Sequence, residues 1–426
     1  MSRVVVIGAG AMGLAAGYYA LERDHDVTML EAAPEPGGMA AHFDLGGISI
    51  ERFYHFVCKA DQSTFDLLDE LGLGDRMRWV ATSMGYYVDG QLYPWGDPVS
   101  LLKFPKLSLF DKLRYGAMMF LETKRTNWQS LEEVSAKDWI TRWCGPRVYE
   151  RMWEPLFRLK FFEYADPISA AWIWTRVKRV GTSRRSIFQE QLGYIEGGSQ
   201  TLVDALVKAI AARGGTLRLA TPASKVEVAD GGVIGVRAGA TFFPADAVIC
   251  TVPTPYVSRL VPDLPTADRA RYDAIKNIGV VCVVFRLKRS ITPHFWVNII
   301  DPSFEVPGII EFSNLRPTGD TVVYIPYYMP TTHPKFAKDA DFFRIEGFGY
   351  LKRLNPGLED SDLVACHTAR LTHAQPVCPP RFLAMLPPIQ TTIRGLQIAD
   401  TCFYYPEDRG ISESVRFAKM MAARVP

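Results

Sequence analysis

Three glycines near the amino end of the chain have a spacing that suits the binding of a phosphate group. Gly8, Gly10 and Gly13 follow the β-branched run "VVVI" in the order G-x-G-x-x-G, with Ala11 and Met12 between the last two. The first glycine allows a tight turn, the second lets the backbone approach a pyrophosphate, and the third lets a helix pack closely on the strand. The amino end of that helix directs free N–H groups at the same pyrophosphate. This loop therefore predicts a nucleotide site.

An acid in the expected place strengthens this prediction. The second predicted strand, "DVTMLE", ends at Glu31, where a carboxylate can accept a hydrogen bond from a ribose 2′-hydroxyl. A glycine-rich turn without a ligand is the alternative, but the complete order of strand, loop, helix, strand and acid favours a dinucleotide. The same acid disfavours a 2′-phosphate, so NADP is not expected.

A second pair of glycines bears on the choice between NAD and FAD. Gly37 and Gly38 follow soon after Glu31, and a short apolar hairpin comes next. An NAD domain would usually continue with another βα unit, whereas a glycine pair suggests a second close approach to the same ligand. We also expect Ala32, next to Glu31, and Met39, next to Gly38, to contact this ligand.

These motifs resemble a large family of flavoproteins that contains amine oxidases, protoporphyrinogen oxidases and phytoene desaturases, with UDP-galactopyranose mutase as a more distant relative. The resemblance implies that the cofactor is FAD. It also implies that Tyr54, His55 and Phe56, in "ERFYHFV", lie beside the isoalloxazine ring. A strand around Val226 is expected on the adenine side, and Thr251 is expected to close over the cofactor.

The carboxyl end carries two further elements that the resemblance explains. "LQIAD" is a predicted strand that ends in Asp400, and the resemblance places this acid near the ribityl chain and pyrophosphate. The last predicted helix begins at Gly410, Ile411 and Ser412, and its amino end is expected to face the flavin pyrimidine. A helix amino terminus stabilises the negative charge of a reduced flavin. Ser412 and Ser414 are candidates to cap this helix.

The size and the pattern of the chain predict an α/β fold in several parts. We expect a Rossmann-like FAD-binding domain with a mixed α+β substrate domain and a helical insertion. The FAD-binding domain is assigned to residues 1–80, 191–275 and 390–426. The helical insertion is assigned to residues 81–190, and the substrate-domain sheet to residues 276–389. Plausible wall residues of a substrate chamber are Tyr324, Tyr327, Tyr328 and Arg370.

Composition excludes several other classes of protein. The formal net charge of +2 disfavours a nucleic-acid partner, and the seven scattered cysteines indicate neither a disulfide framework nor a metal site. No apolar run is long enough to span a bilayer, so we expect a cytoplasmic protein. The stretch "LLKFPKLSLFDKLRYGAMMF" is either a packed amphipathic helix or a peripheral membrane contact. The basic residues Lys178, Arg179, Arg184 and Arg185 indicate a solvated face or a phosphate site.

Two residues are candidates for a catalytic role. His55 could tune the flavin or relay a proton, or it could be a structural histidine. Arg409 could balance a reduced flavin or bind an anionic group of a small-molecule substrate, or it could pair with Glu407 or Asp408.

Three classes of function fit these motifs. The favoured one is an FAD-dependent oxidoreductase (an oxidase, a dehydrogenase or a desaturase) that acts on an amine or a CH–CH group of a small or lipophilic substrate. The alternative is a redox-neutral nucleotide-sugar mutase, for which Arg184 and Arg185 would hold the diphosphate. The third is a flavin-binding protein without turnover.

Overall fold

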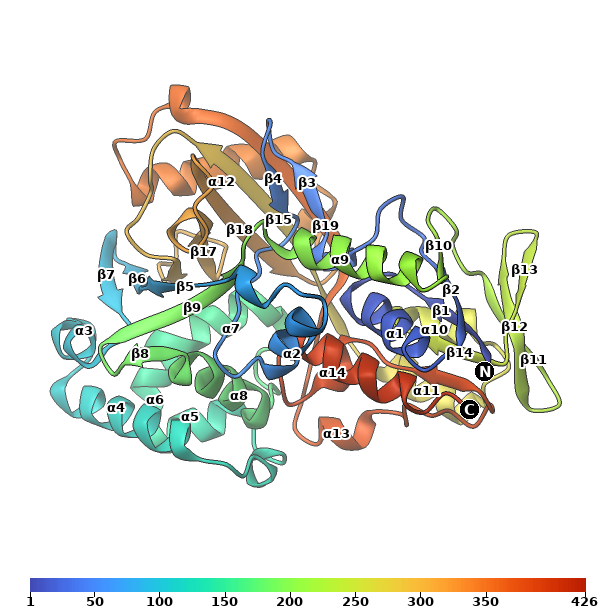
Figure 1. Cartoon of the computed structure of the whole chain (residues 1–426). Coiled ribbons are helices and arrows are strands. Elements are labelled where there is room, and N and C mark those ends of the chain that lie inside the picture. Colours follow the sequence, from blue (N-terminus) through green and yellow to red (C-terminus); the bar gives the residue numbers. More distant parts are fainter.

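The computed structural model describes all 426 residues, and five β-sheets organise them (Figure 1). A parallel sheet of five strands has the order β10-β2-β1-β14-β20. Its central strand β1 is almost entirely buried, which explains the unbroken run of β-branched residues. The strands are β1 (Arg3–Ile7), β2 (Asp26–Leu30), β10 (Thr216–Arg218), β14 (Ala247–Cys250) and β20 (Leu396–Ile398).

Helices from distant parts of the sequence pack around this sheet. α1 (Ala11–Leu21) contacts both α9 (Ser199–Ala212) and α14 (Ile411–Ala422), so the first and last helices lie side by side (Figure 1). α2 (Gln62–Glu70) packs on α14. The α/β fold predicted from the sequence is confirmed. The smaller elements of the chain are the hairpin β3 (His42–Asp44) and β4 (Ser49–Glu51), the antiparallel sheet β11 (Lys225–Ala229), β12 (Gly232–Ala238) and β13 (Thr241–Pro244), and the helices α10 (Val257–Leu260), α11 (Thr266–Ala274) and α13 (Phe382–Met385).

A second large sheet has seven strands in the order β19-β15-β18-β17-β16-β6-β7. Its long strand β15 (Asn277–Leu287) pairs antiparallel with β18 (Thr321–Met329) on one side and with the edge strand β19 (Leu363–Pro376) on the other. α12 (Ala340–Leu354) packs on β15 and β19. The other strands are β6 (Met84–Val88), β7 (Gln91–Trp95), β16 (Trp296–Ile299) and β17 (Gly308–Glu311).

A helical part lies next to this sheet (Figure 1). α7 contacts β18, and α8 packs against both α4 and α5. A three-stranded sheet of order β5-β9-β8 adjoins these helices in sequence. Its strands are β5 (Met77–Thr82), β8 (Arg184–Ser186) and β9 (Gln189–Ile195). The helices are α3 (Pro98–Lys103), α4 (Leu109–Lys124), α5 (Ala136–Cys144), α6 (Pro146–Val148), α7 (Glu154–Phe161) and α8 (Ala170–Thr182).

The expected helical insertion, residues 81–190, does not begin with helices, and this part of the prediction is wrong. β6 and β7 form a hairpin that extends the seven-stranded sheet through the pairing of β6 with β16. The turn between them is Asp89-Gly90, and both residues have positive φ angles, 51° and 72°. An Asp-Gly turn between two apolar runs is a strong hairpin signal, which the predominance of helical patterns around it concealed. The division of the chain into domains otherwise stays a prediction.

Candidate functional site

A cavity of about 1330 Å³ runs between the parallel sheet, the seven-stranded sheet and the helical part. Typical ligand pockets measure roughly 300–1000 Å³, so this one has room for a large cofactor together with a substrate. All of the expected site residues line it except Val226 and Ser412. The lining residues are Gly8, Gly10, Ala11, Met12, Gly13, Glu31, Ala32, Gly37, Gly38, Met39, Tyr54, His55, Phe56, Thr251, Asp400, Arg409, Gly410 and Ile411.

The phosphate loop has the geometry that its glycines predict. A Cβ atom at Gly13 would lie 1.9 Å from the carbonyl oxygen of Gly8, so only glycine lets α1 approach the loop this closely. A Cβ atom at Gly10 would meet no atom within 4 Å, and Gly10 lines the cavity. No side chain caps α1 at Gly10. The first turn of this helix is therefore open to a phosphate group.

The second glycine pair packs directly on this loop. The N–H group of Gly37 donates to the carbonyl oxygen of Ala9 over 2.7 Å, and Gly37 forms a parallel bridge with Gly10. A Cβ atom at Gly38 would lie 3.2 Å from the Cα atom of Gly10. The two glycine motifs thus build a single wall made of backbone.

Glu31 connects the loop to the end of β2. One carboxylate oxygen accepts from the N–H group of Ala9 at 2.6 Å, and the other accepts from the N–H group of Ala33 at 2.8 Å. Each oxygen keeps a second lone pair, and the residue lines the cavity. The Glu31 carboxylate can accordingly accept further hydrogen bonds from a ribose.

Thr251 and Asp400 stabilise the opposite edge of this region. The hydroxyl of Thr251 donates to the carbonyl oxygen of Ile7 over 2.9 Å, next to the phosphate loop. Asp400 follows β20 and accepts from the N–H groups of Thr254, at 2.6 Å, and Cys402, at 2.9 Å. Burial raises the pKa of Asp400, and these hydrogen bonds act in the opposite direction.

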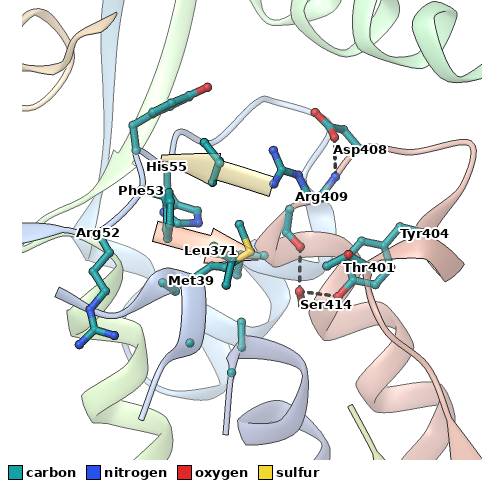
Figure 2. Close-up of a pocket in the computed structure, with 18 of the residues that line it drawn as sticks. Met39, Arg52, Phe53, His55, Leu371, Thr401, Tyr404, Asp408, Arg409 and Ser414 are labelled. Carbon is teal, nitrogen blue, oxygen red and sulfur yellow. Dashed lines mark hydrogen bonds between the residues drawn. The ribbon is translucent and has the colours of Figure 1, made fainter. Parts of the chain in front are cut away.

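The amino end of α14 faces the cavity without a side-chain cap. Gly410 is the N-cap residue, and no side chain accepts a hydrogen bond from the first turn. The expectation that Ser412 or Ser414 caps the helix is wrong, because the Ser414 hydroxyl bonds to the hydroxyl of Tyr404, at 2.7 Å, and donates to the carbonyl oxygen of Gly410 (Figure 2). Ser414 lines the cavity and Ser412 does not.

Val226 also differs from the expectation. It lies in β11, is fully buried in the main hydrophobic core, and does not line the cavity. The cavity wall in this region consists of the residues just before that strand, Pro222, Ala223 and Ser224. The side chain of Val226 is packed inward because the strand alternates its side chains between two faces.

His55 and Arg409, the two candidate catalytic residues, both face the pocket (Figure 2). The Nδ1 atom of His55 is buried without a hydrogen-bond partner, and burial lowers the pKa of this histidine. Arg409 donates to the carbonyl oxygen of Ala374 and, over 3.5 Å, to the hydroxyl of Tyr328. Its Nε atom has no partner.

Two of the four expected chamber-wall residues line the cavity, Tyr328 and Arg370. Tyr327 points to the other face of β18 and packs on Phe343 of α12. Tyr324 is buried, and its hydroxyl donates to the carbonyl oxygen of Glu51. The alternation of side chains along β18 separates Tyr327 from Tyr328, whereas Tyr324 lies on the same face as Tyr328 but four residues away along the strand.

Several cavity residues had no signal in the sequence. Lys160 of α7 and Arg176 of α8 come from the helical part, and Asp408 lies beside Arg409 in the loop before α14. The positions of Lys160 and Arg176 in the sequence follow no recognisable motif, because the two residues approach this loop only through the packing of α7 on β18 and the contacts of α8 with Pro406 and Asp408.

The family described as flavin containing amine oxidoreductase matches residues 13–343. This chain belongs to that family. Because the match covers most of the chain, FAD-dependent oxidoreductase is the class of this enzyme and FAD is its cofactor. The resemblance stated from the sequence is confirmed.

Curated relatives agree with this family. Amine oxidase [flavin-containing] A from Canis lupus familiaris is 22% identical over 79% of this chain and 67% of its own length. A 15-cis-phytoene desaturase from Solanum lycopersicum is 22% identical over 61% of this chain. Protoporphyrinogen oxidase 2 from Arabidopsis thaliana is 27% identical over 36% of this chain and 31% of its own length. The chain spans about half the length of the phytoene desaturases that it matches, 48% for the tomato protein.

Solved structures show the same fold. A putrescine oxidase structure superposes with a TM-score of 0.74 and 17% identity, and the match covers 99% of this chain and 98% of the other. A reduced UDP-galactopyranose mutase gives a TM-score of 0.73 and 15% identity over 99% of this chain and 93% of the other. At these identities the comparison establishes the fold and leaves the substrate open.

The residues of this cavity fit FAD. Gly10 has no side chain, so the loop stays open to a ligand. Glu31 has free lone pairs at the end of β2, and no side chain caps the start of α14. The phosphate loop and Glu31 would hold the adenosine diphosphate part, and the amino end of α14 would face the flavin. A bound flavin accepts a hydride at N5.

Proposed function

We propose that this protein removes a hydride from a CH–CH group or an amine carbon of a small or lipophilic substrate. The observation that supports this is the apolar section of the same cavity, which continues from the cofactor residues into the helical part. Aromatic and aliphatic side chains there would exclude water and bind a hydrocarbon surface. They include Tyr115, Trp153, Leu156, Phe157, Phe161 and Ile173.

His55 and Arg409 are proposed to serve the flavin from two sides. Because burial lowers its pKa, His55 is neutral at pH 7, and its partnerless Nδ1 atom can hold or release a proton. Arg409 precedes Gly410 and adds a positive charge beside the amino end of α14. The Arg409 charge and the helix amino end favour a negative charge on a reduced flavin.

The alternative function, a nucleotide-sugar mutase, required Arg184 and Arg185 to hold a diphosphate, and the positions of these two residues do not support it. Arg184 donates to the backbone carbonyl oxygens of Gly96, Ser186 and Ile187. Neither Arg184 nor Arg185 lines the cavity. A diphosphate in the cavity would not reach these side chains.

The outer face of α4 supports the further proposal of peripheral contact with an anionic membrane surface. Leu109, Phe110 and Leu113 are each at least 60% exposed. Lys112 of the same helix donates to the carbonyl oxygen of Leu102, which directly precedes Lys103 at the end of α3. Apolar side chains flanked by lysines suit the interface of a negatively charged bilayer. The inner face of the same helix carries Tyr115, which lines the cavity, so a lipophilic substrate would have a short path to the site.

No helix of the structure combines the length and the apolar composition that a membrane crossing requires. Any contact with a bilayer is therefore proposed at its surface, and a cytoplasmic location is part of the same proposal.

The decisive experiment is anaerobic spectroscopy of the purified holoprotein. Three pools are added separately: alkenes of lipid type, amines, and nucleotide sugars. We expect either the alkenes or the amines to bleach the absorbance of the oxidised flavin. Bleaching by no pool, with sugar turnover only after chemical reduction, would contradict the proposal. His55→Ala should slow the bleaching without loss of bound FAD.

A further inference from the structure

Three cationic side chains and one carboxylate meet in the cavity where the helical part faces β18. Lys160, Arg176 and Arg409 supply the positive charges, and Asp408 is the carboxylate among them. The carboxylate of Asp408 accepts from Arg176 at 2.5 Å and from the backbone N–H group of Arg409 at 2.8 Å. The cluster thus contains more cationic groups than anionic ones.

Lys160 has no hydrogen bond or ion pair in the structure. Its Nζ atom lies 4.9 Å from the ring centre of Tyr328, 5.6 Å from that of Phe161 and 5.7 Å from that of Trp172. Burial, and secondly Arg176, hold the pKa of Lys160 well below its usual value. An ammonium in such a place is stabilised only when an anion accompanies it.

The two arginines are fixed but retain hydrogen-bonding capacity. Arg176 stacks on the ring of Trp172 at 3.9 Å and donates to Gln375 as well as to Asp408. The Nε atoms of both Arg176 and Arg409 are buried without a partner. Fixed guanidinium groups bind carboxylates and phosphates well because little side-chain freedom is lost on binding.

We propose that the substrate of this cavity is an apolar molecule with a terminal carboxylate or phosphate, and that Lys160, supported by Arg176 and Arg409, binds this oxyanion. The proposal rests on the function proposed above and narrows its substrate class. A protonated amine in the same place would be repelled by the cationic cluster. Among the two chemistries considered, the cluster therefore favours oxidation of a CH–CH group.

Binding to the oxidised holoprotein tests this proposal without turnover. Decanoate, decyl phosphate, decanol and decylamine are titrated, and occupancy is followed by the change in flavin absorbance and by equilibrium dialysis. We expect decanoate or decyl phosphate to bind at least about tenfold more tightly than decanol, with decylamine weakest. The better of the two anions identifies the oxyanion.

Single-residue variants show whether the anion binds at Lys160. Lys160→Met should weaken binding of the anion by about 10- to 100-fold and leave decanol binding unchanged, and Lys160→Arg should restore it. Lys137→Met, which removes an exposed lysine paired with Asp166, is the matched control and should change nothing. A normal flavin spectrum in each variant shows that the fold is retained.

Two outcomes would overturn the proposal. The first is equal affinity for decanoate, decyl phosphate and decanol in the native protein. The second is a Lys160→Met variant whose anion affinity is unchanged while its flavin midpoint potential shifts, since the cluster would then serve the cofactor. Failure of every substrate pool to bleach the flavin, with intact anion binding, would instead contradict the proposed hydride transfer alone.

Discussion

At the scale of single residues, Glu31 joins two parts of the nucleotide site. Its two oxygens hold the N–H groups of Ala9 and Ala33, so that the loop after β1 and the segment after β2 keep a fixed separation. The same residue lines the cavity. Loss of the carboxylate would therefore remove a ligand contact and loosen the loop that makes the other contacts.

We predict that Glu31→Ala raises the dissociation constant of FAD by about 10- to 100-fold. A carboxylate hydrogen bond contributes roughly 1.5–3 kcal/mol, and this amount corresponds to that range. Fluorescence titration of the apoprotein with FAD measures the effect. Glu35→Ala, which removes an exposed partner of Arg52, is the control, and equal affinities in both variants would contradict the prediction.

Asp408 gives a prediction about acid stability. Burial alone would raise its pKa, but Arg176, Arg409 and Lys160 hold it at about 2. Because the folded pKa is lower than the unfolded one, the ion pair stabilises the protein above about pH 4, and this contribution is lost as the pH falls toward 2. Asp408→Asn should reduce the free energy of unfolding by roughly 3 kcal/mol at pH 7.

Urea unfolding of native protein and Asp408→Asn, at pH 7 and at pH 3, measures this difference. The gap should narrow at pH 3, because Asp408 of the unfolded chain is then mostly protonated while the native carboxylate, with a pKa of about 2, is still largely ionised. Asp246→Asn is a matched control: the pKa of Asp246 is also about 2, through its hydrogen bond to Arg3, but the pair is exposed. Exposed pairs contribute less than about 1 kcal/mol, and a larger loss there would show that exposure does not decide the effect.

The residues that could be predicted from the sequence are those whose chemistry is local. Gly10, Gly13 and Glu31 act through the conformation or hydrogen bonds of their own short segment, so spacing along the chain is enough to recognise them. Lys160 and Arg176 carry no such signal. They come together only because α7 packs on β18 and α8 contacts the loop before α14, and that packing depends on side chains far away in the sequence.

At the scale of elements, α4 has two different faces. Tyr115 and Met118 point into the molecule, whereas Leu109, Phe110 and Leu113 are exposed. A helix buried on one side normally carries polar residues on the other. The exposed apolar face of α4 is the surface proposed above to contact an anionic membrane.

We predict that replacement of Leu109, Phe110 and Leu113 by Glu strongly reduces sedimentation of the protein with vesicles that contain anionic phospholipid. The cause is the loss of apolar area together with added repulsion from the lipid charge. Ile345→Glu, on the exposed side of α12, is the control and should sediment like the native protein. If the native protein fails to sediment with these vesicles, the membrane proposal is wrong.

Element prediction succeeded where one pattern continued for a long stretch. β1, β15 and β18 are rich in β-branched residues, and α14 has a regular helical period, so each was recognised. β6 and β7 were missed because a five-residue strand between helical patterns gives a weak signal. Their place in the seven-stranded sheet comes from pairing with β16, about two hundred residues later in the chain, which no local pattern reveals.

At the scale of the whole molecule, distant segments share one sheet and one cavity. β14 pairs with β1 on one side and with β20 on the other, and α1 packs on α14. A ligand that contacts the loop after β1 and the amino end of α14 at once binds only the folded protein. FAD should therefore stabilise the entire parallel sheet.

We predict that FAD at about 100 times its dissociation constant adds about 2.7 kcal/mol to the free energy of unfolding. Scanning calorimetry of apoprotein and holoprotein should show a higher melting temperature for the latter. Hydrogen exchange should slow in α1 and α14 together on addition of FAD, while α12 serves as the internal control. Slower exchange in α1 without any change in α14 would mean that the last helix does not take part in binding.

The pairing of the first helix with the last also concerns the order of events during synthesis. Ser2 and Pro426 are hydrogen-bonded to each other, and the two ends of the chain lie together (Figure 1). The glycine loop and its counterpart at the start of α14 are separated by some four hundred residues of chain. A nascent chain therefore lacks a complete flavin pocket until α14 has been synthesised, and cofactor loading depends on an element made some four hundred residues after the phosphate loop.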